Sequence, residues 1–243
     1  MGRTTTAPGR TRTGGRTVAD ARTEILARLR AARDHRPVPL PVRVPRDYRT
    51  ADADPTGTDP VALLVDRLLD YRATVHRCVP DRLADRIAEV LIGVRRVAVP
   101  QDLPDGWLPG FTGEVLRDDP TRPLSVTDLD QPGLAALTGC AVAIGRTGTV
   151  LLDTGPTQGP RRLTLVPDHH VCVVRTDQVV AEVPAALARL ADPTRPITLI
   201  SGPSATSDIE LNRVEGVHGP RRLDVVLVDT GRQPAAGQPA GTG

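Results

Sequence analysis

The chain of 243 residues contains no lysine, and this absence excludes two classes of enzyme. All 31 basic residues are arginine, set against 29 acidic residues. P-loop nucleotide hydrolases need a lysine at the β- and γ-phosphates, and pyridoxal enzymes need one for the Schiff base. The formal charge of +2 also gives no strong field that would attract a nucleic-acid backbone.

Aromatic residues are also scarce, with one Trp, one Phe and two Tyr. Modules that bind single-stranded nucleic acid stack bases on aromatic side chains, so we expect no nucleic-acid partner. The core must instead be built from Val, Leu, Ile and Ala. At about 100–200 residues per domain, the chain has room for one large domain or two small ones.

The three cysteines, Cys78, Cys140 and Cys172, are too far apart for the CxxC pairs of zinc ribbons or for a cluster motif. We therefore expect no cofactor, iron–sulfur cluster or metal in this chain. Cys140 and Cys172 lie in apolar runs, which favours buried, reduced thiols. The Asp-His-His run at 168–170 is a weak metal motif, because adjacent side chains on an extended chain point to opposite faces.

Hydropathy predicts a protein without a membrane span, since no run approaches the ~20 apolar residues that cross a bilayer. Residues 1–16 are basic but precede no apolar segment, so we expect no secretory leader and a cytoplasmic location. Composition predicts disordered tails at 1–16 and 230–243. Between them we expect an N-terminal helix and proline-rich linker over 17–58, and the main domain over 59–229.

Apolar spacing predicts the elements of each segment. Ile25, Leu26 and Leu29 indicate an amphipathic helix over 18–33, and the prolines of 35–59 then forbid helix. Strands are expected at 73–78, 95–99, 113–116, 140–144, 149–152, 163–166, 171–174, 197–200 and 223–228. Helices are expected from Pro60, after a cap near Asp81, within 129–138 and over 183–190. The buried stripe of the helix at Pro60 is expected to be Val61, Leu64, Val65, Leu68 and Leu69.

Short apolar strands that alternate with helices indicate an α/β fold with a mostly parallel sheet covered by helices on both faces. The close-set strands between 140 and 174 are the exception, and they predict an antiparallel hairpin inserted into that sheet.

Ligands of open α/β sheets bind beyond the carboxyl ends of strands, so the loops after apolar runs are the candidate sites. One loop follows the strand at 140–144, and its glycines would let backbone N–H groups approach a ligand. Its candidate ligand-binding residues are Gly145, Thr147, Gly148 and Thr149. A plain hairpin turn explains the same residues. A second loop, 153–162, carries an Arg pair that either clamps an anion or forms a solvated charged surface.

The loop after the strand at 197–200 is rich in hydroxyl groups and offers N–H and O–H donors to an anion. Helix capping would use one or two of these hydroxyls and does not explain four. The candidate ligand-binding residues here are Ser201, Gly202, Ser204, Thr206, Ser207, Asp208 and, further along, Arg221. A carboxylate beside a histidine can transfer a proton, which makes Glu210, Glu215 and His218 candidate catalytic residues. A polar surface loop laced by Arg–Glu pairs is the commoner explanation.

Three segments resemble the LUD-domain family, specifically its lactate-utilisation protein C members. They are TGCAVAIGRTGTVLLDTGP (138–156), LTLVPDHHVCVV (163–174) and SGPSATSDIELNRVEGVHGPRRLDVVLV (201–228). The resemblance covers about 59–229 and implies a fold related to the NagB/RpiA/CoA-transferase group. It also implies a cluster-free role beside two iron–sulfur partners, lactate-utilisation proteins A and B, in oxidising L-lactate to pyruvate. The resemblance supplies no agreed catalytic residue.

Two other functions stay open. The chain can be a stand-alone enzyme that holds an anionic substrate, phosphorylated or an acyl thioester, in the loop 201–207. It can also be a regulatory or scaffolding module that uses its first helix. No GxGxxG follows a strand, so a flavin or dinucleotide site is not expected.

Overall fold

The computed structural model describes residues 18–35, 57–206, 214–215 and 219–231. The chain forms two units, residues 1–48 and 49–243. The first unit contains helix α1 (Val18–Asp34), which confirms the helix predicted there. The predicted linker from 36 to 56 and the predicted tails before 18 and after 231 lie outside the described residues.

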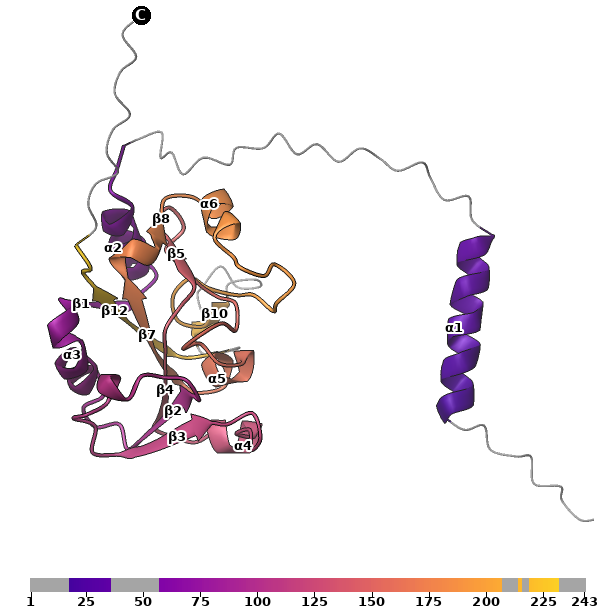
Figure 1. Ribbon diagram of the computed structural model, residues 1–243, viewed down its shortest axis with the longest axis horizontal. Coiled ribbons are helices and arrows are strands. Elements are labelled where there is room, and N and C mark those ends of the chain that lie inside the picture. Colours follow the sequence, from indigo (N-terminus) through magenta and orange to yellow (C-terminus); the bar gives the residue numbers. More distant parts are fainter. Residues whose placement is uncertain (1–17, 36–56, 207–213, 216–218, 232–243) are drawn as a thin grey trace, which may run out of the picture. The chain divides into compact units, whose positions relative to one another are not determined.

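The second unit is built on a six-stranded parallel sheet with the order β1-β12-β7-β4-β2-β3 (Figure 1). Its strands are β1 (Thr74–Cys78), β2 (Arg96–Pro100), β3 (Glu114–Asp118), β4 (Leu134–Thr138), β7 (His169–Arg175) and β12 (Arg222–Val228). The central strands are almost entirely buried, as expected for a sheet covered on both faces. The parallel α/β prediction is confirmed, and β3 lies at the edge of the sheet.

A second, four-stranded sheet has the order β8-β5-β6-β9. It contains β5 (Val142–Ile144), β6 (Thr149–Leu152), β8 (Val179–Val180) and β9 (Thr198–Ile200). Strands β5 and β6 form the predicted antiparallel hairpin. Its predicted insertion into the parallel sheet is wrong, because the hairpin pairs with β8 and β9 instead. A further short antiparallel pair joins β10 (Ala205–Thr206) to β11 (Val214–Glu215).

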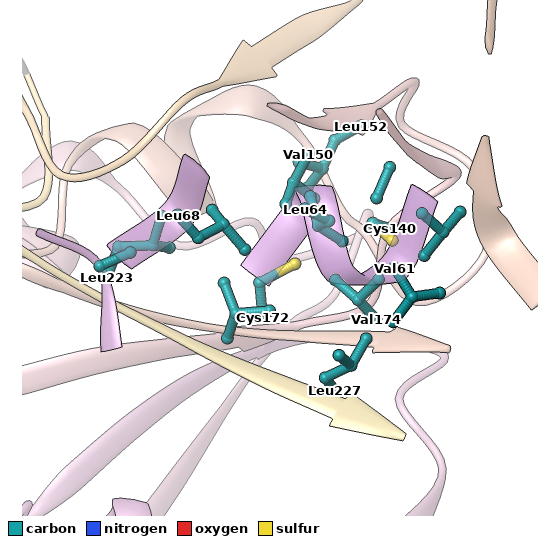
Figure 2. Packing of buried hydrophobic residues seen from close by; sticks show 14 residues of the cluster. Val61, Leu64, Leu68, Cys140, Val150, Leu152, Cys172, Val174, Leu223 and Leu227 are labelled. Atoms are coloured by element: carbon teal, nitrogen blue, oxygen red, sulfur yellow. The ribbon is translucent and has the colours of Figure 1, made fainter. Parts of the chain in front are cut away.

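Helix α2 (Pro60–Asp70) packs between the two sheets. Pro60 occupies its first turn and the Asp59 carboxylate accepts hydrogen bonds from Val61 N and Ala62 N, which caps the helix. Figure 2 shows its Leu64 and Leu68 among apolar side chains of both sheets. The predicted stripe is wrong at Leu69, which is 55% exposed.

Other helices cover the remaining faces. Helix α3 (Leu83–Val90) packs on the opposite face of the parallel sheet from α2, and α6 (Val183–Ala188) packs against the second sheet. The short helices are η1 (Pro80–Arg82), η2 (Asp105–Trp107), α4 (Val126–Leu129), α5 (Arg161–Leu165) and η3 (Thr176–Gln178). No cap forms at Asp81, because the 3₁₀ turn η1 leads directly into α3.

Two predicted elements have the wrong type. The segment 129–138, expected to contain a helix, instead supplies β4, because its small apolar residues fit the buried middle of the sheet. The segment 163–166, expected to be a strand, lies in and just after α5, which begins beyond Pro160. Apolar runs this short fit either structure, so only the tertiary context decides between them.

The thiols of Cys140 and Cys172 are free and buried, which confirms the prediction for both. The adjacent Cys172 thiol and burial together raise the pKa of Cys140, so it remains protonated and unreactive. These cysteines are part of the core between the sheets (Figure 2).

Candidate functional site

Two of the predicted ligand loops lie side by side at one end of the second sheet. Strand β6 is antiparallel to both β5 and β9, so the carboxyl ends of β5 and β9 point the same way. Thr149 Oγ1 and Ser201 Oγ share a hydrogen bond of 2.8 Å, and Thr147 Oγ1 lies 2.7 Å from Thr149 Oγ1. The structure thus joins the hydroxyl groups of loops that are far apart in the sequence.

The glycines of the first loop serve packing against α2. A Cβ on Gly145 would lie 2.5 Å from the carbonyl oxygen of Pro60, and one on Gly148 would lie 2.5 Å from Arg67 Cβ. Gly148 also has a φ of +60°, which favours glycine. The backbone of this loop therefore approaches helix α2 closely, while it also connects the antiparallel strands β5 and β6.

A cavity of about 270 Å³ opens beside Ser201. It is lined by the loop residues Ser201, Gly202 and Ser204, together with Leu199 and Leu223 from β9 and β12. His170, the second residue of β7, also lines it. The carboxyl end of β9 therefore meets the amino ends of β7 and β12 around this cavity.

His170 is a polar residue of this cavity that was not among the predicted ligand-binding residues. It is fully buried, and its Nε2 lies 2.8 Å from Thr138 Oγ1. Its other ring nitrogen, Nδ1, has no hydrogen-bond partner within the described residues. Burial, and then the nearby His169, lowers the pKa of His170 to about 3, so the ring is neutral near pH 7.

The remaining predicted site residues do not line this cavity or cannot be placed in it. The guanidinium of Arg221 is 3.6 Å from the Asp168 carboxylate on the surface, with its side chain 68% exposed. Thr206 and Glu215 lie in β10 and β11, whose side chains are not described. The other four predicted residues lie outside the described residues, and they are Ser207, Asp208, Glu210 and His218.

A second polar cluster lies on the other face of the parallel sheet, centred on Asp224 of β12. This carboxylate is fully buried and accepts hydrogen bonds from His76 Nε2 and His169 Nε2, each at 2.7 Å. Arg222 Nε lies 2.6 Å from its second oxygen. The sequence pattern does not reveal the cluster, because its members come from three strands that only the sheet brings together. It did predict correctly that His169 and His170 point to opposite faces.

The carboxylate of Asp224 stays ionised. Burial raises its pKa, but the hydrogen bonds from His169, His76 and Arg222 outweigh burial and lower the pKa to about 2. An ionised carboxylate can only accept hydrogen bonds, so the Nε2 atoms of His76 and His169 must both donate to Asp224. If either ring is neutral, its Nδ1 atom then carries a lone pair and can accept a hydrogen bond.

The carboxyl ends of the parallel strands form a separate cleft of about 340 Å³. Its walls include Trp107, the only tryptophan of the chain, and Arg175 and Gln178 after β7. The polar groups here have partners: Arg175 pairs with Asp177 through two contacts of 3.0 Å, and Gln178 Nε2 donates to the Cys140 carbonyl at 2.7 Å.

The loop 153–162 borders this end of the sheet and carries the predicted Arg pair. Arg162 makes two hydrogen bonds to the nearly buried Asp118, of 2.7 and 2.9 Å, so its guanidinium is a structural partner. Thr154 and Thr157 adopt positive φ values of 59° and 64°, which are unusual for β-branched residues. The Thr157 N–H donates to Asp102 and its carbonyl accepts from Gly139 N, and these bonds hold the loop in place.

In the described ranges, no group of three or more His, Cys, Asp or Glu side chains has the arrangement of a metal site. Among the helices that the structure describes, none combines the length and apolar character needed to cross a bilayer.

The fold and these motifs place the chain among LUD-domain proteins, whose family profile matches residues 134–228. Lactate utilization protein C of Deinococcus radiodurans is 46% identical over 215 residues, which cover 86% of this chain and 96% of that protein. Lactate utilization protein C of Halalkalibacterium halodurans is 34% identical over 93 residues, 35% of this chain and 40% of that protein. The chain belongs to the lactate utilization protein C family.

The fold agrees with a solved relative. The crystal structure of a DUF162-family protein from Deinococcus radiodurans is 42% identical and superposes with a TM-score of 0.59, covering 70% of this chain and 96% of that one.

Proposed function

We propose that this chain is the cluster-free component of a three-protein system that oxidises L-lactate to pyruvate in the cytoplasm. The observation that carries the proposal is its 46% identity across nearly the whole length of a lactate utilization protein C. The iron–sulfur clusters belong to partner proteins A and B, since two of the three thiols here are buried in the core and the third, Cys78, is partly buried. On this proposal the fold is a variant of the NagB/RpiA/CoA-transferase group.

The test is reconstitution. The purified chain, alone and with both iron–sulfur partners, is assayed for lactate-dependent reduction of a dye. We expect activity only in the complete mixture, with a loss when this chain is omitted. Strong activity of the isolated chain, or full activity of the partners without it, contradicts the proposal.

A stand-alone enzyme acting on an anionic substrate is the second candidate function. The hydrogen bond between Thr149 and Ser201 favours it, because it joins two hydroxyl-bearing loops beside a cavity. This candidate predicts that inorganic phosphate, a phosphorylated sugar or an acyl thioester raises the melting temperature of the isolated chain. If none of these compounds does so, the candidate loses its support.

A further inference from the structure

We propose that the cavity beside Ser201 binds a small 2-hydroxy or 2-oxo monocarboxylate, and that His170 Nδ1 hydrogen-bonds to an oxygen of this ligand. The choice of ligand class rests on the proposed function, whereas the assignment of His170 rests on the structure alone.

The size and shape of the cavity suit a small ligand. Its volume of about 270 Å³ equals roughly nine water molecules in the liquid, enough for an acid with six non-hydrogen atoms and some solvent. Ser201 at its wall is exposed, whereas His170 is fully buried. The cavity is therefore bounded by an exposed residue, Ser201, and by a fully buried one, His170.

Among the residues that the structure describes, none is a hydrogen-bond partner for the Nδ1 atom of His170. A buried polar atom without a hydrogen bond is costly, by ~1–3 kcal/mol, and buried nitrogens in folded proteins are nearly always paired. In the described part of the chain only Arg86 Nε shares this condition. A ligand oxygen at the inner end of the cavity would remove the cost.

The lining of the cavity determines which ligands it accepts. Apart from His170, the described residues that line it include no acidic or basic side chain. A dianionic phosphate would find no cation among these residues and would lose more hydration free energy than a monoanionic carboxylate. When the Ser201 hydroxyl accepts from Thr149 Oγ1, it can donate to a carboxylate, while Leu165, Leu199 and Leu223 suit a methyl group.

A neutral imidazole fits both forms of the ligand. The Thr138 hydroxyl can donate to Nε2 or accept from it, so Nδ1 can be either the N–H or the lone pair. The lone pair accepts from the hydroxyl group of a 2-hydroxy acid, and the N–H donates to the carbonyl group of a 2-oxo acid. Thr138 thus serves as a positioning residue that allows either tautomer.

The test uses the purified full chain, with L-lactate, pyruvate and inorganic phosphate as probes in thermal melts and calorimetric titrations. We expect lactate or pyruvate to raise the melting temperature in a saturable way, and phosphate at equal concentration to have no effect. The double variant His170→Leu/Thr138→Val removes both members of the buried polar pair together. Such a variant should melt no lower than the parent chain and bind the acids at least tenfold more weakly.

The matched control is His169→Asn, which alters the neighbouring histidine on the opposite face. It should lower the melting temperature, because it disturbs the Asp224 cluster, and should leave ligand affinity unchanged. If the double variant does not fold, Ser204→Leu fills the cavity while the His170–Thr138 pair stays intact, and it should abolish binding.

Three outcomes overturn the inference. They are no binding of either acid by the parent chain, unchanged affinity in the double variant or in Ser204→Leu, and binding of phosphate in preference to the acids. If the binding experiments fail but the reconstitution succeeds, the proposed function is supported and the ligand site must lie elsewhere in the protein. Binding with a failed reconstitution supports the cavity and contradicts the three-protein system.

Discussion

The amino and carboxyl ends of the parallel strands differ in how their polar groups are satisfied. At the amino end, Asp224 is buried and receives three donors. On the other face, one nitrogen of His170 has no partner within the described ranges of the chain. At the carboxyl end, Arg175 pairs with Asp177 on the surface, and each is about half exposed. Asp224 and His170 at the amino end are therefore fully buried, whereas the Arg175–Asp177 ion pair at the carboxyl end is exposed to solvent.

This difference shows how a second sheet changes where a ligand can bind. Ligands of parallel sheets normally lie beyond the carboxyl ends of the strands, and a cleft does exist there beside Trp107. In this protein the carboxyl end of β9, from the other sheet, faces the amino end of β7. The hydroxyl-bearing loop of one sheet therefore meets the buried histidine of the other.

The largest expected effect is that of Asp224→Ala. Removing the carboxylate leaves His76, His169 and Arg222 without their acceptor, and removal of one partner from a buried charged network costs ~3–5 kcal/mol. Urea unfolding monitored by circular dichroism measures the loss. Asp177→Ala is the control from the carboxyl end, expected to cost below ~1 kcal/mol because its ion pair is exposed. Equal losses at the two ends would refute the comparison.

The second effect is a loss of stability in mild acid. The pKa of His170 is about 3 in the folded state and near its ordinary 6.5 in the unfolded chain, so below pH 6.5 only the unfolded chain takes up this proton. Stability should therefore fall between pH 6.5 and 3, by up to about 1.4 kcal/mol per pH unit. The Asp224 carboxylate, with its pKa near 2, adds a further loss below pH 3.8.

Unfolding midpoints at pH 7, 5.5 and 4 test the contribution of His170. The variant His170→Leu/Thr138→Val should show a flatter dependence over this range than the parent chain. An identical slope in both proteins would mean that His170 takes up its proton equally well in the folded state.

The third effect separates backbone strain from close packing at the amino-end cavity. Gly202 has a φ of +91°, and a Cβ there would lie 2.6 Å from Tyr71 Cβ, so Gly202→Ala should cost ~1–3 kcal/mol. Gly133 has a similar φ of +74° with nothing within 4 Å of an added Cβ. Gly133→Ala should cost less, and thermal melts of the two variants compare them. A larger loss at Gly133 would contradict the role of Tyr71.

The smallest effect concerns fluorescence. Trp107 is the only tryptophan and lines the cleft at the carboxyl end, away from His170. Titration with L-lactate or pyruvate should therefore leave its emission almost unchanged while the melting temperature rises. Strong quenching of Trp107 by either acid would place the ligand in the carboxyl-end cleft instead.

Much of the architecture follows from local pattern. The helix that starts at Pro60 and the strands at 171–174 and 223–228 were predicted because their apolar spacing and capping residues are strong signals. The segments 129–138 and 163–166 were predicted wrongly, since short runs of Leu, Ala and Val fit both a buried strand and a short helix. Of the candidate site, the sequence singled out the loops that contain Gly145–Thr149 and Ser201, but it did not indicate the roles of His170 and the Asp224 cluster.

The class of fold, the burial of two thiols and the family could all be inferred from the sequence, because composition, periodicity and motifs are local properties. The absence of lysine likewise excluded the enzymes that depend on a lysine side chain. The tertiary structure alone decided that the β5–β6 hairpin joins a second sheet and that His76, His169 and Asp224 meet. The tertiary structure also places Nδ1 of His170 where no other described residue bonds to it. Hydrogen bonds between residues far apart in the chain depend on the order and register of the strands. The apolar pattern of each strand alone does not specify either of these.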